Sequence, residues 1–292
     1  MALHFERHTD ADIIASGSFP ARVKRVGRWV STDMKVDSSL AAIVTGGASG
    51  LGYATVKALR DNGAQVAIFD IDAETGNLAA HQTGATYCHC DVTADDSVDR
   101  AFAAARARQG QERALVCCAG GGNAILTAGR DKRTGEISIF PSEEFERILR
   151  LNTVGTFRCI TRAAAGMMTL DYRDGERGAI VSTASAAATE GQMGQAAYSA
   201  AKSAIVGMTL TVARDLSCEG IRVNAIRPGL FNTPMMTRAR PEVLQSLSAA
   251  VPFPRRLGDP EEFASLVVEL LRNGYLNGET IRLDGALRMP PR

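Results

Sequence analysis

The chain has 292 residues, a length that suits one or two domains, and a single α/β domain often reaches this size. Its apolar fraction of 45% and its near-neutral charge, 33 Lys+Arg against 32 Asp+Glu, are typical of an ordinary globular protein, so no nucleic-acid partner is expected. No apolar run reaches the roughly 18 residues of a membrane span, so no membrane partner is expected either.

Residues 1–38 mix basic with acidic side chains. A transit peptide should be poor in acidic residues, so this stretch is not typical of one. We expect an N-terminal extension over 1–38, either non-native or partly ordered, and a single domain over 39–292. Met34 would also serve as a start for that domain, and the sequence leaves this choice open.

From Leu40 the chain alternates short continuous apolar runs with longer helical patterns. Such strands, separated by helices, predict a Rossmann-type α/β fold with a doubly wound, mostly parallel sheet of seven strands and helices on both faces. The expected strands are Leu40–Thr45, Gln65–Phe69, Thr86–Cys90, Ala114–Cys118, Ala179–Ser182, Arg222–Ile226 and Thr280–Leu283. The expected helices are Gly50–Asn62, Ala94–Gln109, Glu143–Met168, Ala196–Ser217, Glu261–Arg272 and a short one near Glu242–Ala250.

Two connections in this pattern are long, Gly120–Pro141 and Gly229–Pro260. Long loops inside compact α/β domains are commonly lids or binding loops. Both follow the carboxyl end of an expected strand, which is where such sheets bind ligands. The two connections are therefore candidate parts of a site.

A glycine-rich turn, Thr45–Gly52, lies between the first expected strand and the first expected helix. A helix N-terminus offers unpaired N–H groups and partial positive charge, and Gly46, Gly50 and Gly52 lack the Cβ atoms that would keep a pyrophosphate away. The alternative is a tight strand-to-helix turn without a ligand. Its place near the start of the domain favours a nucleotide site.

Asp70 ends the second expected strand, eighteen residues after Gly52. An acidic residue about 20 positions beyond such a turn hydrogen-bonds the ribose hydroxyls of NAD, and its charge would repel the 2′-phosphate of NADP. No Arg or Lys stands in Gly47-Ala48-Ser49 to compensate. The sequence therefore favours NAD, unless Asp70 is only a turn residue.

Tyr198 and Lys202 are four residues apart on an expected helix, so they share a face. A free phenol titrates near ~10, and a nearby ammonium is expected to lower that pKa. Ser185, thirteen residues upstream, would hydrogen-bond a substrate oxygen whose proton Tyr198 exchanges. Taken alone, a tyrosine and a lysine at this spacing commonly lie on a helix surface without a function. Together with Ser185 they favour acid/base catalysis with hydride transfer.

Six cysteines are scattered along the chain, with no C-x-x-C pair. Cys88-His89-Cys90 lacks the spacing of a metal site, so we expect no metal and interpret it as a strand with packed thiols. Reduced thiols indicate a reducing compartment such as the cytoplasm.

The ordered set of motifs resembles the short-chain dehydrogenase/reductase family over residues from Leu40 to the C-terminus. The turn Arg227-Pro228-Gly229 matches the proline-glycine turn of that family. The other matching blocks are Thr45–Gly52, Asp91-Val92, Cys118-Ala119-Gly120, Asn152 within Leu151–Gly155, and Ser185 with Tyr198 and Lys202.

Within the family, the chain is similar to the type II 3-hydroxyacyl-CoA dehydrogenases, also described as type 10 17β-hydroxysteroid dehydrogenases. This resemblance implies NAD-linked oxidation of a 3-hydroxyacyl-CoA to the 3-oxoacyl-CoA, a role in fatty acid metabolism, and a homotetramer. It implies a cytoplasmic protein, or one of the mitochondrial matrix in a eukaryote. The segments that carry it are Thr183–Tyr198, Pro228–Pro234, Val251–Pro260 and Leu276–Gly285.

The resemblance also implies roles for single residues. Tyr198 would accept the proton, Lys202 would also hold the nicotinamide ribose, and Asn152 would complete a proton relay through water. Ser185, Gln192 and Tyr198 would face the substrate. With the glycines of the turn, the expected cofactor-binding set is Gly46, Ser49, Gly50, Leu51, Gly52, Asp70, Asp91, Val92, Cys118, Ala119, Gly120, Tyr198, Lys202, Pro228, Phe231 and Thr233.

Cys117 departs from the family pattern, which usually has an Asn there that bridges neighbouring strands. The sheet near the cofactor would then be supported differently. The connection Gly120–Pro141 resembles an insertion of the type II enzymes. Its cations Arg130, Lys132 and Arg133 either hold the phosphates of coenzyme A or form a solvated loop tip.

Other functions stay open at this point. The same scaffold could oxidise another secondary alcohol, such as a steroid or a branched or aromatic acyl-CoA. A 3-oxoacyl-carrier-protein reductase is disfavoured because Asp70 opposes NADPH. A non-catalytic nucleotide-binding scaffold is disfavoured by the intact set of Asn152, Ser185, Tyr198 and Lys202.

Overall fold

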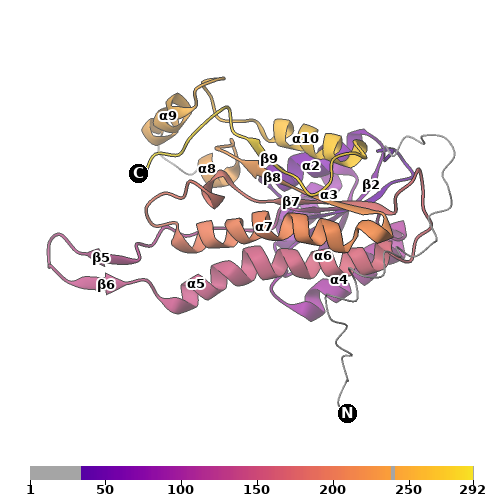
Figure 1. The fold of residues 1–292 in the computed structure, drawn as a ribbon, viewed down its shortest axis with the longest axis horizontal. Helices are drawn as coiled ribbons and strands as arrows, with labels where there is room; N and C mark the ends of the chain where they lie inside the picture. Colours follow the sequence, from indigo (N-terminus) through magenta and orange to yellow (C-terminus); the bar gives the residue numbers. More distant parts are fainter. Residues whose placement is uncertain (1–33, 238–240, 292) are drawn as a thin grey trace, which may run out of the picture. The chain divides into compact units, whose positions relative to one another are not determined.

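The computed structural model describes residues 34–237 and 241–291, and its central feature is a seven-stranded parallel sheet in the order β3-β2-β1-β4-β7-β8-β9 (Figure 1). The strand order reverses beside β1, which confirms the predicted doubly wound sheet. The strands are β1 Ala41–Thr45, β2 Gln65–Asp70, β3 Thr86–His89, β4 Ala114–Cys117, β7 Gly178–Thr183, β8 Ile221–Pro228 and β9 Thr280–Leu283.

Helices cover both faces of the sheet, and each face has its own apolar core. On one face α2 and α10 pack against each other, with Leu59 and Phe263 fully buried. On the other face α4 and α6 bury Phe102 and Met167, and the Phe102 ring meets that of Phe69 from β2 edge-on at 5.1 Å. The helices are α2 Gly50–Asp61, α3 Ala73–Thr83, α4 Asp95–Gln109, α5 Ser142–Leu149, α6 Gly155–Met167, α7 Ala196–Asp215, α8 Pro234–Thr237, α9 Pro241–Ala250 and α10 Pro260–Arg272.

The packed unit begins earlier than the domain expected from residue 39. The chain divides into the units Met1–Ser31 and Thr32–Arg292, and all described residues belong to the second. Met34 and Val36, which fell within the expected extension, are buried in the core beside α2 and α10. The rest of that extension lies outside the described residues. In the part of the chain that is described, no helix is both long and apolar enough to cross a membrane.

Helix α3 and the hairpin of β5 (Ala128–Arg130) with β6 (Ile137–Ile139) were not predicted. Helix α3 carries a weak apolar pattern because it buries only Gly76 and Ala79. A Cβ atom at Gly76 would meet the Tyr87 ring at 2.2 Å, so packing against this ring, and not a turn, favours glycine there. The hairpin extends the connection Gly120–Pro141 away from the sheet (Figure 1).

The helix predicted over Glu143–Met168 is interrupted. Its ends are α5 and α6, and between them Arg150–Val154 form one π-helical turn. Such π-bulges occur frequently at functional sites, since they turn a side chain out of the regular helical register. The side chain in question is that of Asn152, which is fully buried.

One buried ion pair fastens β8 to its surroundings. The Arg222 guanidinium donates to both carboxylate oxygens of Glu176, at 2.6 and 3.2 Å, and both side chains are 7% exposed. It also donates to the carbonyls of Leu270 and Leu271 at the end of α10, each at 2.7 Å. The pair therefore holds the start of β7, the start of β8 and the end of α10 together.

We predict that Glu176→Ala lowers the free energy of unfolding by about 3 kcal/mol, because it leaves a buried guanidinium without its counter-charge. Urea denaturation measures this change. Arg100→Ala is the matched control, since it breaks the Arg100–Asp96 pair, whose side chains are 71% and 73% exposed. We expect a far smaller loss there, because exposed ion pairs contribute little to stability. Equal losses in the two variants would contradict the assignment.

Candidate active site

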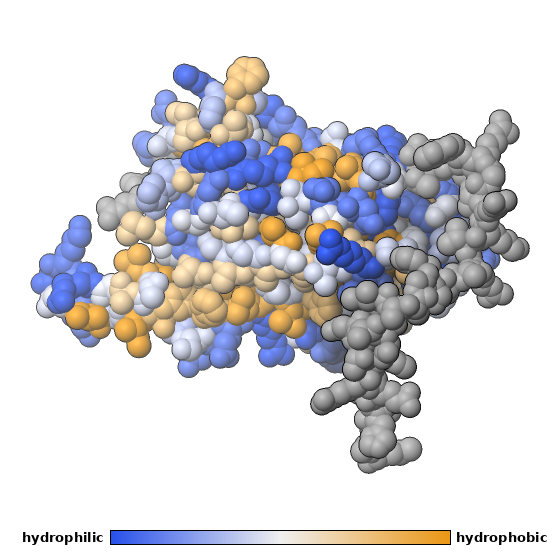
Figure 2. Space-filling model, viewed as in Figure 1, coloured by the Kyte–Doolittle hydropathy of each residue, from blue (hydrophilic) through white to orange (hydrophobic). Residues whose placement is uncertain are grey.

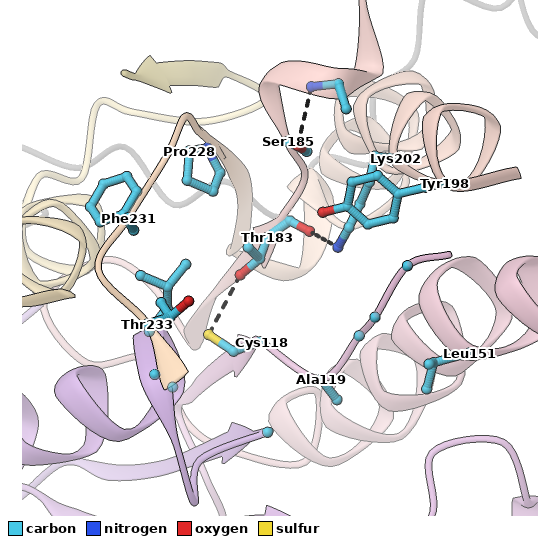
Figure 3. A pocket seen from close by; sticks show the side chains of 18 of the residues that line it. Cys118, Ala119, Leu151, Thr183, Ser185, Tyr198, Lys202, Pro228, Phe231 and Thr233 are labelled. Carbon is cyan, nitrogen blue, oxygen red and sulfur yellow. Dashed lines mark hydrogen bonds between the residues drawn. The ribbon is translucent and has the colours of Figure 1, made fainter. Parts of the chain in front are cut away.

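A cavity of about 890 Å³ opens at the carboxyl ends of the central strands (Figure 3). Its place beside the reversal of strand order is where doubly wound sheets bind ligands. Among the residues expected to act in catalysis, to bind the cofactor or to face the substrate, Asn152 alone does not line it. The others all do: Gly46, Ser49, Gly50, Leu51, Gly52, Asp70, Asp91, Val92, Cys118, Ala119, Gly120, Ser185, Gln192, Tyr198, Lys202, Pro228, Phe231 and Thr233.

Two glycines of the turn before α2 lie in close contact with neighbouring backbone. A Cβ atom at Gly46 would lie 2.7 Å from the Ala119 nitrogen, and one at Gly52 would lie 2.0 Å from the Gly46 oxygen. These two glycines let the turn pack against its own helix and against the segment after β4. Both glycines also line the cavity, and their expected role in giving a pyrophosphate access to the turn stays a prediction.

The N-terminus of α2 suits an anion. Its N-cap Ser49 makes no side-chain capping bond, and the first turn contains no acidic residue. The first N–H groups of the helix therefore keep their hydrogen-bonding capacity and their partial positive charge. These features fit a dinucleotide pyrophosphate.

The Asp70 carboxylate is held at the end of β2 beside this turn. Its Oδ2 accepts from the Ala48 N–H at 3.1 Å, and its Oδ1 accepts from the Asp72 N–H at 3.2 Å. Each oxygen retains acceptor capacity for a hydroxyl. The carboxylate can therefore accept hydrogen bonds from a ribose diol, and its negative charge would repel a phosphate on that ribose.

Tyr198 and Lys202 come from neighbouring turns of α7 and meet at the cavity (Figure 3). The Lys202 ammonium lies 5.8 Å from the centre of the Tyr198 ring and donates to the Thr183 carbonyl, at the end of β7, at 2.8 Å. Lys202 is 5% exposed, and this burial lowers its pKa to about 8.

The Tyr198 phenol does not have the lowered pKa that we expected. Burial raises its pKa above the usual value, and a hydrogen bond with Ser185 opposes the rise in part. The prediction overlooked desolvation, which is the largest effect on the pKa of this phenol. Ser185 is itself fixed, since its Oγ accepts from the Ala187 N–H at 3.1 Å.

Asn152 lies behind the cavity wall and fastens the segment after β4. Its Nδ2 donates to the carbonyls of Ile148, at 2.9 Å, and Gly121, at 2.8 Å, and its Oδ1 accepts from the Gly121 N–H at 3.2 Å. A Cβ atom at Gly120 would lie 2.6 Å from this Oδ1 and 3.4 Å from the Lys202 ammonium. The π-helical turn thus places the Asn152 side chain beside Gly120, and Lys202 lies on the other side of that glycine.

The cysteines near the site are packed side chains. Cys117 on β4 stands directly opposite Ser182 on β7. Burial raises the pKa of the Cys117 thiol, and the Ser182 hydroxyl opposes this rise in part. This pairing occupies the place of the Asn that the family usually has. Cys118 lines the cavity, and its Sγ accepts from the Thr183 hydroxyl at 3.5 Å. Cys88 and Cys90 are buried as predicted.

Several residues of the cavity escaped prediction. Thr183 ends an apolar strand, so its position could have been inferred from the strand pattern. Met236, Leu247 and Met289 also line the cavity, and no motif marks them. Arg130, Lys132 and Arg133 are on the hairpin and do not line it, so their contact with coenzyme A stays a hypothesis.

Comparison with known proteins agrees with this geometry. A family model described as enoyl-(acyl carrier protein) reductase matches residues 46–287. The chain is 47% identical over 254 residues to 3-hydroxyacyl-CoA dehydrogenase type-2 of Drosophila melanogaster, covering 86% of this chain and 98% of that protein. It is 46% identical over 256 residues to the Homo sapiens protein of the same name, covering 86% and 96%. A crystal structure of 3-hydroxyacyl-CoA dehydrogenase type-2 from Mycobacterium avium shares 43% identity with a TM-score of 0.81, covering 89% of this chain and 100% of that one.

The lowered pKa of Lys202 predicts a stability change with pH. The unfolded chain holds this proton up to about the ordinary lysine pKa of 10.5, whereas the folded chain releases it near 8. Stability should therefore rise between these two pH values, by at most about 3 kcal/mol relative to Lys202→Met. Urea denaturation of both proteins across this pH window measures the difference. Lys57→Met is the control, because the Lys57 pKa is raised by Asp61. A flat difference for Lys202→Met would contradict the burial argument.

Proposed function

The chain belongs to the short-chain dehydrogenase/reductase family, and from this membership we propose that it is an NAD-dependent 3-hydroxyacyl-CoA dehydrogenase. The reaction is the oxidation of a 3-hydroxyacyl-CoA by NAD to a 3-oxoacyl-CoA and NADH. One observation carries the proposal. Ser185, Tyr198 and Lys202 meet at the same cavity as the glycine-rich start of α2, in a chain 47% identical to a protein named 3-hydroxyacyl-CoA dehydrogenase type-2.

In this reaction Tyr198 exchanges the proton of the substrate hydroxyl. During oxidation the phenolate oxygen accepts that proton, and during reduction the phenol returns it. A nicotinamide cofactor, when bound, would supply the hydride chemistry, as the acceptor in oxidation and the donor in reduction. Because burial raises the pKa of Tyr198, the phenolate needs stabilisation, and the Ser185 hydroxyl and the Lys202 ammonium are the groups placed to provide it.

Two features support NAD as the cofactor. The uncapped N-terminus of α2 would hold the pyrophosphate, and Lys202 would hold the nicotinamide ribose while its charge acts on Tyr198. Asp70 would accept from the adenosine ribose hydroxyls. The 2′-phosphate of NADP would lie at the same ribose and would be repelled by the Asp70 carboxylate, which the turn holds in place.

We also propose that the enzyme is a homotetramer. Apolar side chains gather on one face of the molecule, where they form a band over α6 and α7 (Figure 2). Phe157 and Leu210 are 47% and 45% exposed on these two helices. Apolar surface of this kind favours association. Light scattering with size-exclusion chromatography tests the assembly.

The activity is tested by acetoacetyl-CoA reduction, followed at the nicotinamide absorbance. We predict turnover with NADH, and a loss of about 100-fold or more in Tyr198→Phe, since the phenyl ring cannot donate a proton. Tyr172→Phe is the control, because Tyr172 is 51% exposed and does not line the cavity. NADH binding by fluorescence should persist in Tyr198→Phe. Full turnover by that variant would remove Tyr198 from the mechanism, and turnover of a steroid alone would reassign the substrate.

The cofactor choice is tested at Asp70. We predict that Asp70→Asn raises the ratio of kcat/KM for NADPH over NADH about tenfold, because it removes a negative charge from the expected position of the 2′-phosphate. Asp61→Asn, at the exposed end of α2, should leave this ratio unchanged. Wild-type preference for NADPH would contradict the role assigned to Asp70.

A further inference from the structure

The segment after β9, Ala286–Pro291, runs along the loop that follows Ser185. The Gln192 amide donates to the Pro290 carbonyl at 3.1 Å, and the Met193 N–H donates to the Pro291 carbonyl at 3.0 Å. Leu287 is 1% exposed and anchors the segment in the protein. The end of the described chain is thus fixed to the substrate side of the cavity.

Glu190 is the shared acceptor that joins this segment to the loop. Its carboxylate accepts from Arg282 at 2.6 and 3.1 Å and from the Met289 N–H at 3.3 Å, and Arg288 lies 3.4 Å away. Arg282 also pairs with Asp284 and donates to the Leu287 carbonyl at 2.9 Å. Charge-assisted bonds of this kind are stronger than neutral ones, so the network fixes the backbone at Met289.

The Met289 side chain, placed by this network, lines the active-site cavity. Met236 of α8 and Leu247 of α9 line the same cavity. The proton-transfer groups and the cofactor need none of these three side chains. An acyl chain does need apolar walls, and methionine adapts to chains of different shape.

We propose that the C-terminal segment Arg288–Pro291 forms a wall of the acyl-binding part of the cavity, with Met289 contacting the acyl chain as a specificity-determining residue. Glu190 is its positioning residue. This inference rests on the proposed function. It also explains why Gln192, expected to face the substrate, gives an amide hydrogen to Pro290: the loop and the segment make one wall together.

The test compares acetoacetyl-CoA with 3-oxodecanoyl-CoA in the full chain. We expect Met289→Ala to lower kcat/KM for the longer substrate about tenfold, chiefly through KM, because truncation removes apolar contact with the acyl chain. The value for acetoacetyl-CoA should change less than about twofold. Met193→Ala is the matched control, since Met193 is on the same loop but does not line the cavity.

Glu190→Gln keeps the shape of the side chain and removes its charge. We expect the ratio of the two kcat/KM values to shift in the same direction, about fivefold, whereas a merely structural role would lower stability and leave that ratio unchanged. Equal losses of kcat/KM on both substrates, or no change in Met289→Ala, would overturn the inference. The proposed function would still stand in that case, provided that the wild type turns over acetoacetyl-CoA. A wild type that turns over neither substrate would overturn both.

Discussion

Burying the ammonium of Lys202 costs free energy, and the centre of the cavity is arranged around that cation. Its hydrogen bond goes to the carbonyl of Thr183, the last residue of β7, and no salt bridge among residues 34–237 and 241–291 includes it. The charge is thus only partly compensated, and its pKa falls to about 8. A carboxylate beside it would restore that pKa and would also cancel its field at Tyr198. Incomplete compensation leaves the ammonium able to stabilise a phenolate.

The second buried cation, Arg222, shows the opposite arrangement. Its guanidinium has a buried carboxylate and backbone carbonyls as partners, so its hydrogen-bonding capacity is satisfied within the fold. Arg222 stands at the beginning of β8, at the opposite end of the sheet from the cavity. The two sites show that full pairing serves the packing of strands, whereas partial pairing at the carboxyl ends keeps a charge available for chemistry.

The sheet could be predicted because its strands are buried on both faces and therefore read as continuous apolar runs, as in Ala41–Thr45. The π-helical turn could not, since it depends on bonds between Asn152 and Gly121, thirty-one positions apart. The direction of the Tyr198 pKa shift also escaped prediction. A sequence places a lysine one turn from a tyrosine, but the depth at which both are buried is set by packing from several elements.

The same reasoning explains why the sequence predicts the chemistry of the site but not its substrate selectivity. Proton transfer and pyrophosphate binding require particular atoms at particular positions, so Ser185, Tyr198 and the turn before α2 leave recognisable spacings. A wall for an acyl chain requires only apolar volume at the right place, which Met236, Leu247 or Met289 can provide from unrelated segments. What fixes Met289 is the carboxylate of Glu190, ninety-nine positions earlier, and such a bond has no local signature. On the proposal made here for Met289, substrate selectivity is set by segments that follow the strands, including the one after β9, and it can be inferred only once the fold has brought these segments together.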